Sequence, residues 1–401
     1  MVSIATLALS LIYILDYSFI CIWSMRMIRE KSSDLIENIL LLLLSINLVS
    51  GIINYSMLKL PVLKIQLTSV ILLFVLAILA NRFTVEQITV GAICIAVTFI
   101  SWMFYGATSE FLFLILLMIG GSLINPKKVL QLTAIITTCS LIFLFLLSKF
   151  GIITNLLFWK NGSYRQSFGM IYPLTFAAFV LYAVVSFSMV SFSDNSNHIW
   201  AIVIIILAIT LNKYNQARND SIALIAIALL FCFNLNKIPN IKKITEIGLI
   251  SVEILAVGMV FLSKIIPNAT NMYYKMNSIS SNRLYLQNIL FSNYHPSAFG
   301  KYIPEVGFGG QGQQVQGYFY IDSSYTRIFF MGGVILFVLF MYIIWRLISK
   351  FIRLGLYRHA WLLIIVMLTA ITEDTFSKLG TNILIPIFLC NEQVIKDSFI
   401  T

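Results

Sequence analysis

Charged residues are scarce in this chain of 401 residues. Asp, Glu, Lys and Arg make up only 11% of the sequence, whereas hydrophobic residues make up 59%. Soluble domains contain roughly 45–50% apolar and about 25% charged residues, so the composition excludes a soluble enzyme and a disordered chain. The apolar runs are long and continuous rather than alternating, which excludes a transmembrane barrel and predicts a helical membrane protein.

Cysteine and histidine are also sparse. The five cysteines lie inside or at the ends of apolar runs and have no short pairwise spacing. They therefore read as small core residues, not as disulfide or metal partners. The three histidines form no pair with zinc-type spacing. We expect neither a metal nor a cofactor.

The net charge of +11 does not indicate nucleic acid, because the basic residues are spread through short loops without interleaved aromatics. Membrane orientation and anionic lipid headgroups explain most of this charge. The run from Ile4 to Trp23 has no basic leader and contains Asp16, so it predicts a first membrane helix rather than a cleavable signal.

The hydropathy pattern predicts an all-α integral membrane protein, a single polytopic domain over residues 1–401 with about twelve transmembrane helices. Polar residues near 372–374 and 377–378 interrupt the last window, which reads as a bent helix or a hairpin. The expected windows are 3–23, 38–58, 62–80, 88–105, 107–124, 129–148, 169–191, 199–212, 221–235, 244–265, 326–348 and 360–390.

Four basic clusters agree on one topology under the positive-inside rule. They place on the outside the segments 149–168 and 213–220 and a large loop at 266–325, between the tenth and eleventh spans. A long loop in an otherwise compact protein is usually functional. The cytoplasmic clusters are Arg26, Arg29 and Lys31; Lys127 and Lys128; Lys237, Lys242 and Lys243; and Lys350, Arg353 and Arg358.

Each of the three external segments carries an arginine where topology disfavours positive charge: Arg165, Arg218 and Arg283. Such residues suit the binding of an anion, since a guanidinium matches phosphate oxygens, although headgroup anchoring at helix ends explains most single cations. Arg165 stands in a stretch, 164–173, that predicts the start of a helix.

In the large loop, residues 281–290 predict a short amphipathic helix capped by Ser281 or Asn282, with Leu284, Ile289 and Leu290 on its apolar side. Arg283 falls in its first turn. The glycine-rich run 307–317 lacks the ending of a P-loop and is not a nucleotide site. Asp322 follows it among hydroxyl residues, where it either accepts a proton or caps a helix.

In this order the motifs resemble the Wzy-type polysaccharide polymerases, relatives of the O-antigen ligases. Arg165-x-Ser167-Phe168-Gly169 with Pro173 looks like their Arg-x-Ser-Leu-Gly…Pro element, and Arg218 is similar to the arginine of their Ser-Arg-Thr element. The sequence at 281–284 looks like their Ser-Gly-Arg-Leu element, and 299–300 and 320–325 follow in the expected order.

The chain departs from the family's pattern at several positions. Tyr172 and Leu174 flank the proline where His and Asn are common, and Asn282 replaces a glycine. Ala217 and Asn219 flank Arg218. Asp322 stands where the ligases tend to have histidine, which favours a polymerase and leaves the identity of the base open.

The resemblance implies metal-independent glycosyl transfer from an undecaprenyl-pyrophosphate-linked glycan to a hydroxyl of another lipid-linked repeat unit of O-antigen, capsule or exopolysaccharide. It places the protein in the bacterial cytoplasmic membrane with its active face on the periplasmic side. Membrane lipids and other polysaccharide export proteins are the further expected partners, and nucleic acid is not one.

The resemblance also suggests roles for individual residues. Arg165, Arg218 and Arg283 would bind the pyrophosphate. The base would be Asp322 or His295, with Glu305 and Asp220 as further candidates, and the sugars would contact Tyr164, Tyr285 and Tyr325. Two alternatives stay open: a flippase for lipid-linked oligosaccharides, which would also need arginines for pyrophosphate, and an O-antigen-type ligase with a different acceptor.

Overall fold

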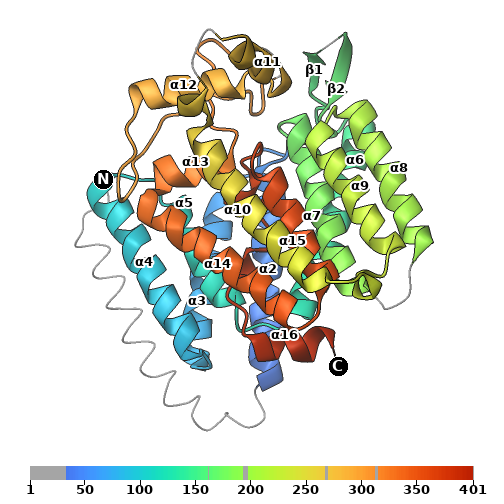
Figure 1. Cartoon of the computed structure of the whole chain (residues 1–401), viewed down its shortest axis with the longest axis vertical. Coiled ribbons are helices and arrows are strands. Elements are labelled where there is room, and N and C mark those ends of the chain that lie inside the picture. Colours follow the sequence, from blue (N-terminus) through green and yellow to red (C-terminus); the bar gives the residue numbers. More distant parts are fainter. Residues whose placement is uncertain (1–32, 161, 193–196, 267–269, 312–314, 401) are drawn as a thin grey trace.

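The computed structural model describes residues 33–160, 162–192, 197–266, 270–311 and 315–400. The described chain forms a bundle of helices (Figure 1). The first expected span, 3–23, and the first basic cluster lie outside the described residues.

Within the described residues, seven helices are long and apolar enough to cross a membrane, which confirms the predicted class of all-α membrane protein. Three shorter apolar helices accompany them: α5 (Glu110–Gly121), α8 (His198–Tyr214) and α15 (Tyr357–Thr369). The count of about twelve spans stays a prediction. The seven are α2 (Ser33–Asn54), α3 (Leu63–Ala80), α4 (Val85–Tyr105), α6 (Pro126–Lys149), α7 (Pro173–Ser191), α10 (Ile241–Ile265) and α14 (Val334–Arg353).

Local sequence explains where several of these helices begin. Thr84 and Gln87 form a reciprocal capping box at the start of α4. At the start of α6, Asn125 accepts from two backbone amides and Pro126 occupies the first turn, where its missing amide hydrogen costs nothing. These N-terminal caps fix where α4 and α6 begin, which hydropathy alone leaves uncertain.

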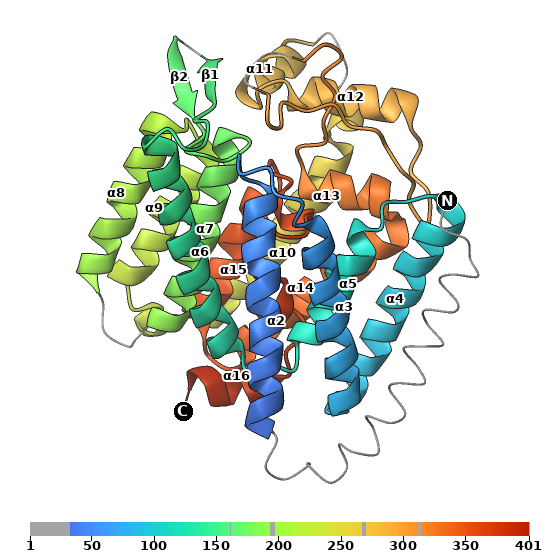
Figure 2. The same ribbon diagram turned by 180° about the vertical axis from the view of Figure 1, so that it is seen from behind.

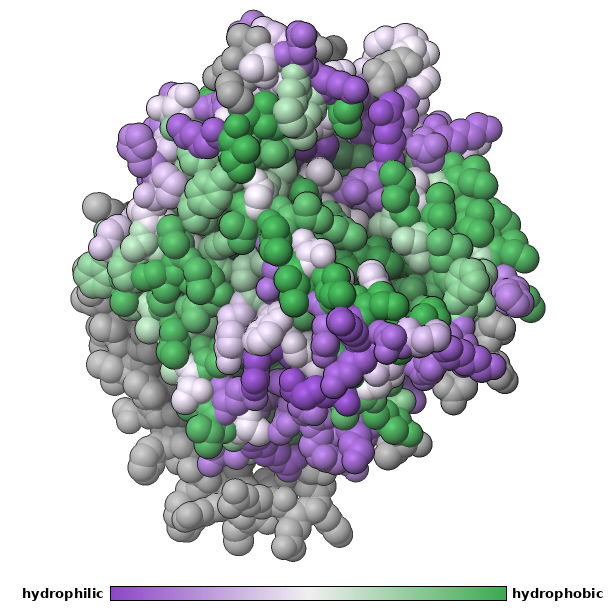
Figure 3. Space-filling model, in the orientation of Figure 1, coloured by the Kyte–Doolittle hydropathy of each residue, from purple (hydrophilic) through white to green (hydrophobic). Residues whose placement is uncertain are grey.

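The two ends of the bundle differ. The end that carries α11 (Asn271–Ile279), α12 (Arg283–Asn293) and a β-hairpin is here named the loop end (Figures 1 and 2). The three described basic clusters lie at the opposite end, where α6, α10 and α15 begin and α14 ends. Hydrophobic residues cover the middle of the face drawn in Figure 3, and hydrophilic residues gather at its ends.

The last expected span, 360–390, is neither a bent helix nor a hairpin. Helix α15 ends at Thr369, and residues 370–391 are irregular and largely buried, with two 3-10 turns, η3 (Thr375–Ser377) and η4 (Ile385–Ile387). Side chains satisfy this backbone: Asn382 donates to Phe376 O at 2.8 Å and accepts from Leu384 N at 3.1 Å. Irregular backbone at membrane depth is tolerated only when it is enclosed by protein in this way.

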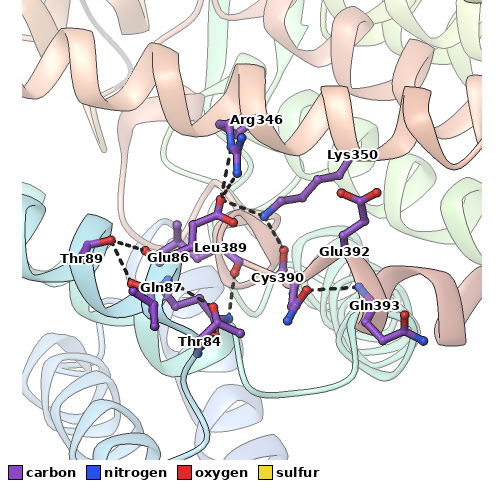
Figure 4. Close-up of polar contacts among 12 residues, drawn as sticks. Thr84, Glu86, Gln87, Thr89, Arg346, Lys350, Leu389, Cys390, Glu392 and Gln393 are labelled. Carbon is purple, nitrogen blue, oxygen red and sulfur yellow. Dashed lines mark hydrogen bonds and ion pairs between the residues drawn. The ribbon is translucent and has the colours of Figure 1, made fainter.

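Polar contacts hold α4, α14 and the chain before α16 (Glu392–Phe399) together at the opposite end. Figure 4 shows Arg346 and Lys350 converging on Glu86, at 2.9 Å and 3.3 Å. Lys350 also donates to Cys390 O at 3.0 Å, and Gln87 donates to Leu389 O at 2.9 Å. The buried Lys350 is therefore a structural cation, in contrast to the exposed Arg353 of the same cluster.

A two-stranded hairpin stands where the sequence predicted a helix start. Strand β1 (Leu157–Lys160) pairs antiparallel with β2 (Ser163–Gln166), and α7 begins only at Pro173. Between them Gly169 has φ +84°, and a Cβ atom there would lie 2.6 Å from Ile153 Cδ1 and 3.0 Å from Leu144 O. The segment between β2 and α7 can lie against the end of α6 only because residue 169 has no side chain.

We expect Gly169→Ala to destabilise the protein more than Gly151→Ala. Both glycines have positive φ, but a Cβ at Gly151 meets nothing within 4 Å. The control therefore carries only the backbone strain of about 1–2 kcal/mol, whereas Gly169→Ala adds an overpacking cost of about 1–3 kcal/mol. Thermal unfolding of both variants in detergent micelles measures the difference, and equal melting temperatures would contradict the close packing described here.

Candidate functional site

The large loop at 266–325 is from here on named the long segment. Helices α11 and α12 form its described start and lie over the end of α10 (Figure 1). The amphipathic helix predicted at 281–290 is thus observed as α12, with Asn282 at the N-cap position, but the capping hydrogen bond comes from another residue. Asn282 precedes the helix in a left-handed conformation and makes no side-chain cap. Asn277 of α11 caps it instead, because its Oδ1 accepts from Tyr285 N at 3.0 Å.

The side chain of Gln287 joins α12 to α10. Its amide nitrogen donates to Met259 O at 2.6 Å and Val260 O at 3.0 Å, and its oxygen accepts from Ser263 N at 2.9 Å. The amide therefore inserts into the hydrogen-bond ladder of α10 between Met259 O and Ser263 N, an insertion of the kind that bends helices, and it links the two helices through three hydrogen bonds. Arg283 lies one turn before Gln287 on α12, so this insertion also fixes the position of Arg283.

Arg283 and Asp322 form an ion pair, with 3.4 Å between Nε and Oδ2. Together with Gln287 and Tyr320 they line a pocket that is closed on its apolar side by α10 and α12. Burial raises the pKa of Asp322 from 3.8 to about 6, while the Arg283 charge acts in the opposite direction. Two residues given different roles by the family resemblance are thus direct neighbours here.

Asp322 does not cap a helix, which was the alternative to its role as a base. The N-cap of α13 (Ser324–Arg327) is Ser323, whose hydroxyl accepts from Thr326 N at 3.4 Å. The carboxylate of Asp322 is left to face Arg283, and 26% of its side chain is exposed. It therefore combines a raised pKa with access to the pocket, the two properties of a general base.

A buried charge network, missed by sequence reasoning, anchors the long segment next to this pocket. Arg327 binds both oxygens of Glu305, at 2.8 Å and 2.5 Å. Asp374 lies 4.0 Å from Arg327 and contacts both Lys378 and the hydroxyl of Tyr320. Its one signal in the sequence was the group of charges that interrupts the last apolar window.

Arg165 is 3% exposed and lies in strand β2 rather than at a helix start. Its Nε donates to Asn215 O at 2.9 Å, its NH1 donates to Tyr172 OH at 3.3 Å, and its guanidinium lies 5.4 Å from the centre of the Tyr172 ring. All of these partners are neutral. The fold therefore holds the guanidinium of Arg165 in place with no negative group of the described chain in contact with it.

The charges of the three predicted arginines all act on Lys160 at the end of β1. Partial burial lowers the pKa of Lys160, and so do the positive charges of Arg165, Arg283 and Arg218. The charge of Asp322 opposes this effect. Residues from the hairpin, from the start of α9 (Arg218–Cys232) and from α12 therefore share one electrostatic environment at the loop end. These four basic residues are here named the cation cluster.

The predicted sugar contacts receive unequal support. Tyr164 and Tyr285 are exposed, at 59% and 54%, and Tyr164 packs edge-on against Trp159. Tyr325 is fully buried and donates to Met367 O at 3.0 Å. Its hydroxyl is committed to the core, so this position does not support contact with a sugar.

The other candidate bases also differ from Asp322 in position. His295 is exposed beyond the end of α12. Glu305 is occupied by Arg327, and it also accepts from Ile321 N at 2.9 Å. Asp220 is fully buried in the first turn of α9. Asp322 alone among these four acids and bases lines the pocket.

Comparison with models of known protein families, with curated proteins and with solved structures finds no match to this chain.

We expect the carboxyl of Asp322 to titrate near pH 6 and to titrate at higher pH in Arg283→Ala. The guanidinium stabilises the charged carboxylate, so its removal favours the protonated form. Infrared difference spectroscopy of the protein in lipid nanodiscs measures this titration, and Asp322→Asn identifies the band by removing it. A transition that stays in place or moves to lower pH in Arg283→Ala would show that the two groups do not interact.

Proposed function

We propose that this protein is a polysaccharide polymerase. It transfers a glycan chain from an undecaprenyl-pyrophosphate carrier to a hydroxyl of a second lipid-linked repeat unit, at the loop end of the bundle. In this proposal the loop end faces the periplasm and the helices span the bacterial cytoplasmic membrane. The resemblance of the sequence motifs suggests the reaction class, and the arrangement at the loop end supports the roles proposed for the residues.

The single observation that carries the proposal is the cation cluster. Among the described residues, no carboxylate lies within ion-pair distance of Lys160, Arg165 or Arg218, and Arg283 has one, Asp322. Within this part of the chain Arg165 is buried without a counter-ion, which is costly, whereas Lys160 and Arg218 face solvent, so an anionic ligand would compensate the charge of Arg165 and be attracted by the other two cations. A pyrophosphate, with several oxygens and more than one negative charge, matches that need.

The proposed transfer breaks the bond between C1 of the donor sugar and the pyrophosphate oxygen, which leaves with the electron pair. The acceptor oxygen forms the new bond to C1, and its proton passes to Asp322. The cation cluster stabilises the charge that develops on the leaving pyrophosphate. Arg283 would move from Asp322 to the pyrophosphate as substrate binds, which frees the carboxylate to act as the base.

We expect Arg283→Ala and Arg165→Ala to abolish or strongly reduce polymer formation, by about a hundredfold or more, as the loss of a transition-state contact commonly does. The measurement is polymer length in membranes supplied with lipid-linked repeat units, at matched expression. Lys275→Ala is the matched control, because Lys275 is an exposed cation of the same segment and does not belong to the cation cluster.

Three outcomes separate the possible functions. Loss of polymer with repeat units still accumulating on the periplasmic side supports the polymerase. Accumulation of repeat units on the cytoplasmic side in the variants would instead assign the protein to flipping. Normal polymer in both arginine variants would remove the role proposed for the cation cluster.

We also expect the transfer rate to fall as the pH drops through about 6, because Asp322 becomes protonated there and cannot accept the proton of the acceptor. The pH profile of the initial rate measures this. In Asp322→Asn the remaining activity should lose that acidic limb. An unchanged acidic limb in this variant would assign the limb to another group.

A further inference from the structure

Four side chains form a column that runs from the cation cluster into the long segment. Arg165 lies over the ring of Tyr172 at 5.4 Å, and the Tyr172 ring is stacked with Phe308 at 6.2 Å and an interplanar angle of 12°. Phe308 is stacked in turn with Tyr318, at 4.5 Å and 21°. The column thus begins at Arg165 on the hairpin, continues through Tyr172, the residue before α7, and ends in the long segment.

Backbone hydrogen bonds hold the far part of this column in place. Gly310 N donates to Ile171 O at 3.1 Å, which ties the long segment to the residue beside Tyr172. Val306 and Phe319 exchange two bonds, of 2.8 Å and 3.1 Å, on either side of Phe308 and Tyr318. The ring of Tyr318 is therefore presented by a braced backbone, as a preorganised contact requires.

Tyr318 ends the column. The ring of Tyr172 is contacted by Arg165 and by Phe308, and Phe308 is stacked with both tyrosines. Tyr318 has one stacking partner among the described rings and is only partly buried. It also lies within the electrostatic reach of Asp322 and Arg283, whose charges act on its hydroxyl. A partly exposed ring therefore lies within the electrostatic reach of the proposed base and of Arg283 in the cation cluster.

We propose that the ring of Tyr318 is a subsite for a pyranose sugar, the one bound next to the phosphate. This inference rests on the polymerase proposed above and adds a residue outside the predicted sugar contacts Tyr164, Tyr285 and Tyr325. One face of a pyranose ring presents C–H groups, which pack against the π-face of an aromatic ring as other apolar groups do. The hydroxyls at the edge of the sugar stay free for polar partners.

Position and charge favour a sugar as the occupant. A sugar joined to the pyrophosphate carries its ring directly beside the phosphate oxygens, and Tyr318 lies within the electrostatic reach of Arg283, one of the arginines proposed to bind those oxygens. A lipid tail would need an apolar surface without charges, whereas Asp322 and Arg283 are neighbours of this ring. Tyr172 and Phe308 lie between Arg165 and Tyr318, so the column fixes the direction of the Tyr318 ring, and Arg283 is the cation that acts on this ring.

The test compares two probes on purified protein in lipid nanodiscs. The first is the repeat-unit oligosaccharide released from its lipid carrier, and the second is inorganic pyrophosphate. We expect Tyr318→Leu to weaken oligosaccharide binding about tenfold, because leucine fills the buried space without a π-face, and to leave pyrophosphate binding unchanged. Tyr318→Phe should keep both affinities, since it retains the ring. Tyr302→Leu is the matched control, a tyrosine of the same segment that is 62% exposed.

Each outcome decides the inference. Equal oligosaccharide affinity in Tyr318→Leu and the wild type overturns it, and so does a loss in Tyr318→Phe, which would assign binding to the hydroxyl instead of the ring face. A parallel loss in Tyr302→Leu would also overturn it, as a general effect of the segment. The proposed polymerase fails separately, if wild-type membranes make no polymer or if Arg165→Ala leaves pyrophosphate binding unchanged.

Discussion

The two-point ion pair between Arg327 and Glu305 holds the long segment to the helical bundle. Both side chains are nearly buried, at 7% and 12% exposure, and Glu305 also accepts from the backbone of Ile321, the residue before Asp322. Releasing the segment would leave a charge buried without its partner, at a cost of about 3–5 kcal/mol. The position of Asp322, and with it the pocket that it shares with Arg283, follows from this anchor.

The anchor also divides the charges of the loop end into two groups. Glu305 and Asp374 are occupied by Arg327 and Lys378, so these four charges cancel locally. Within ion-pair distance and among the described residues, the cation cluster has only the carboxylate of Asp322, and Arg283 also acts at longer range on the buried Asp220 and Glu373. One group therefore holds the fold together, and the other keeps a net positive charge that a ligand can neutralise. Arg327, which has a buried carboxylate partner, stabilises the fold, whereas Arg165, which has neutral partners, keeps a charge that a ligand can neutralise. The sequence alone does not distinguish these two kinds of arginine.

Sequence periodicity was sufficient for features that depend on local order. The apolar windows at 62–80, 88–105 and 129–148 correspond closely to α3, α4 and α6, and the amphipathic pattern at 281–290 corresponds to α12. Periodicity failed where contacts between distant parts of the chain determine the local structure. The hairpin at 157–166 has short strands that lie against the bundle, and residues 370–391 read as a span although their backbone is satisfied by side chains from within the protein. No local pattern reports such contacts.

The same limit explains the candidate site. The sequence could single out Arg165, Arg218 and Arg283 because each stands where topology disfavours a cation, and that argument needs no knowledge of neighbours. It could not show that Arg283 faces Asp322, since 39 positions separate them along the chain and only the anchor at Glu305 and the insertion of Gln287 bring them together. The column from Arg165 to Tyr318 joins the hairpin side of the site to the long segment. A ligand that binds the arginines and the ring together would therefore hold both halves of the loop end in one arrangement.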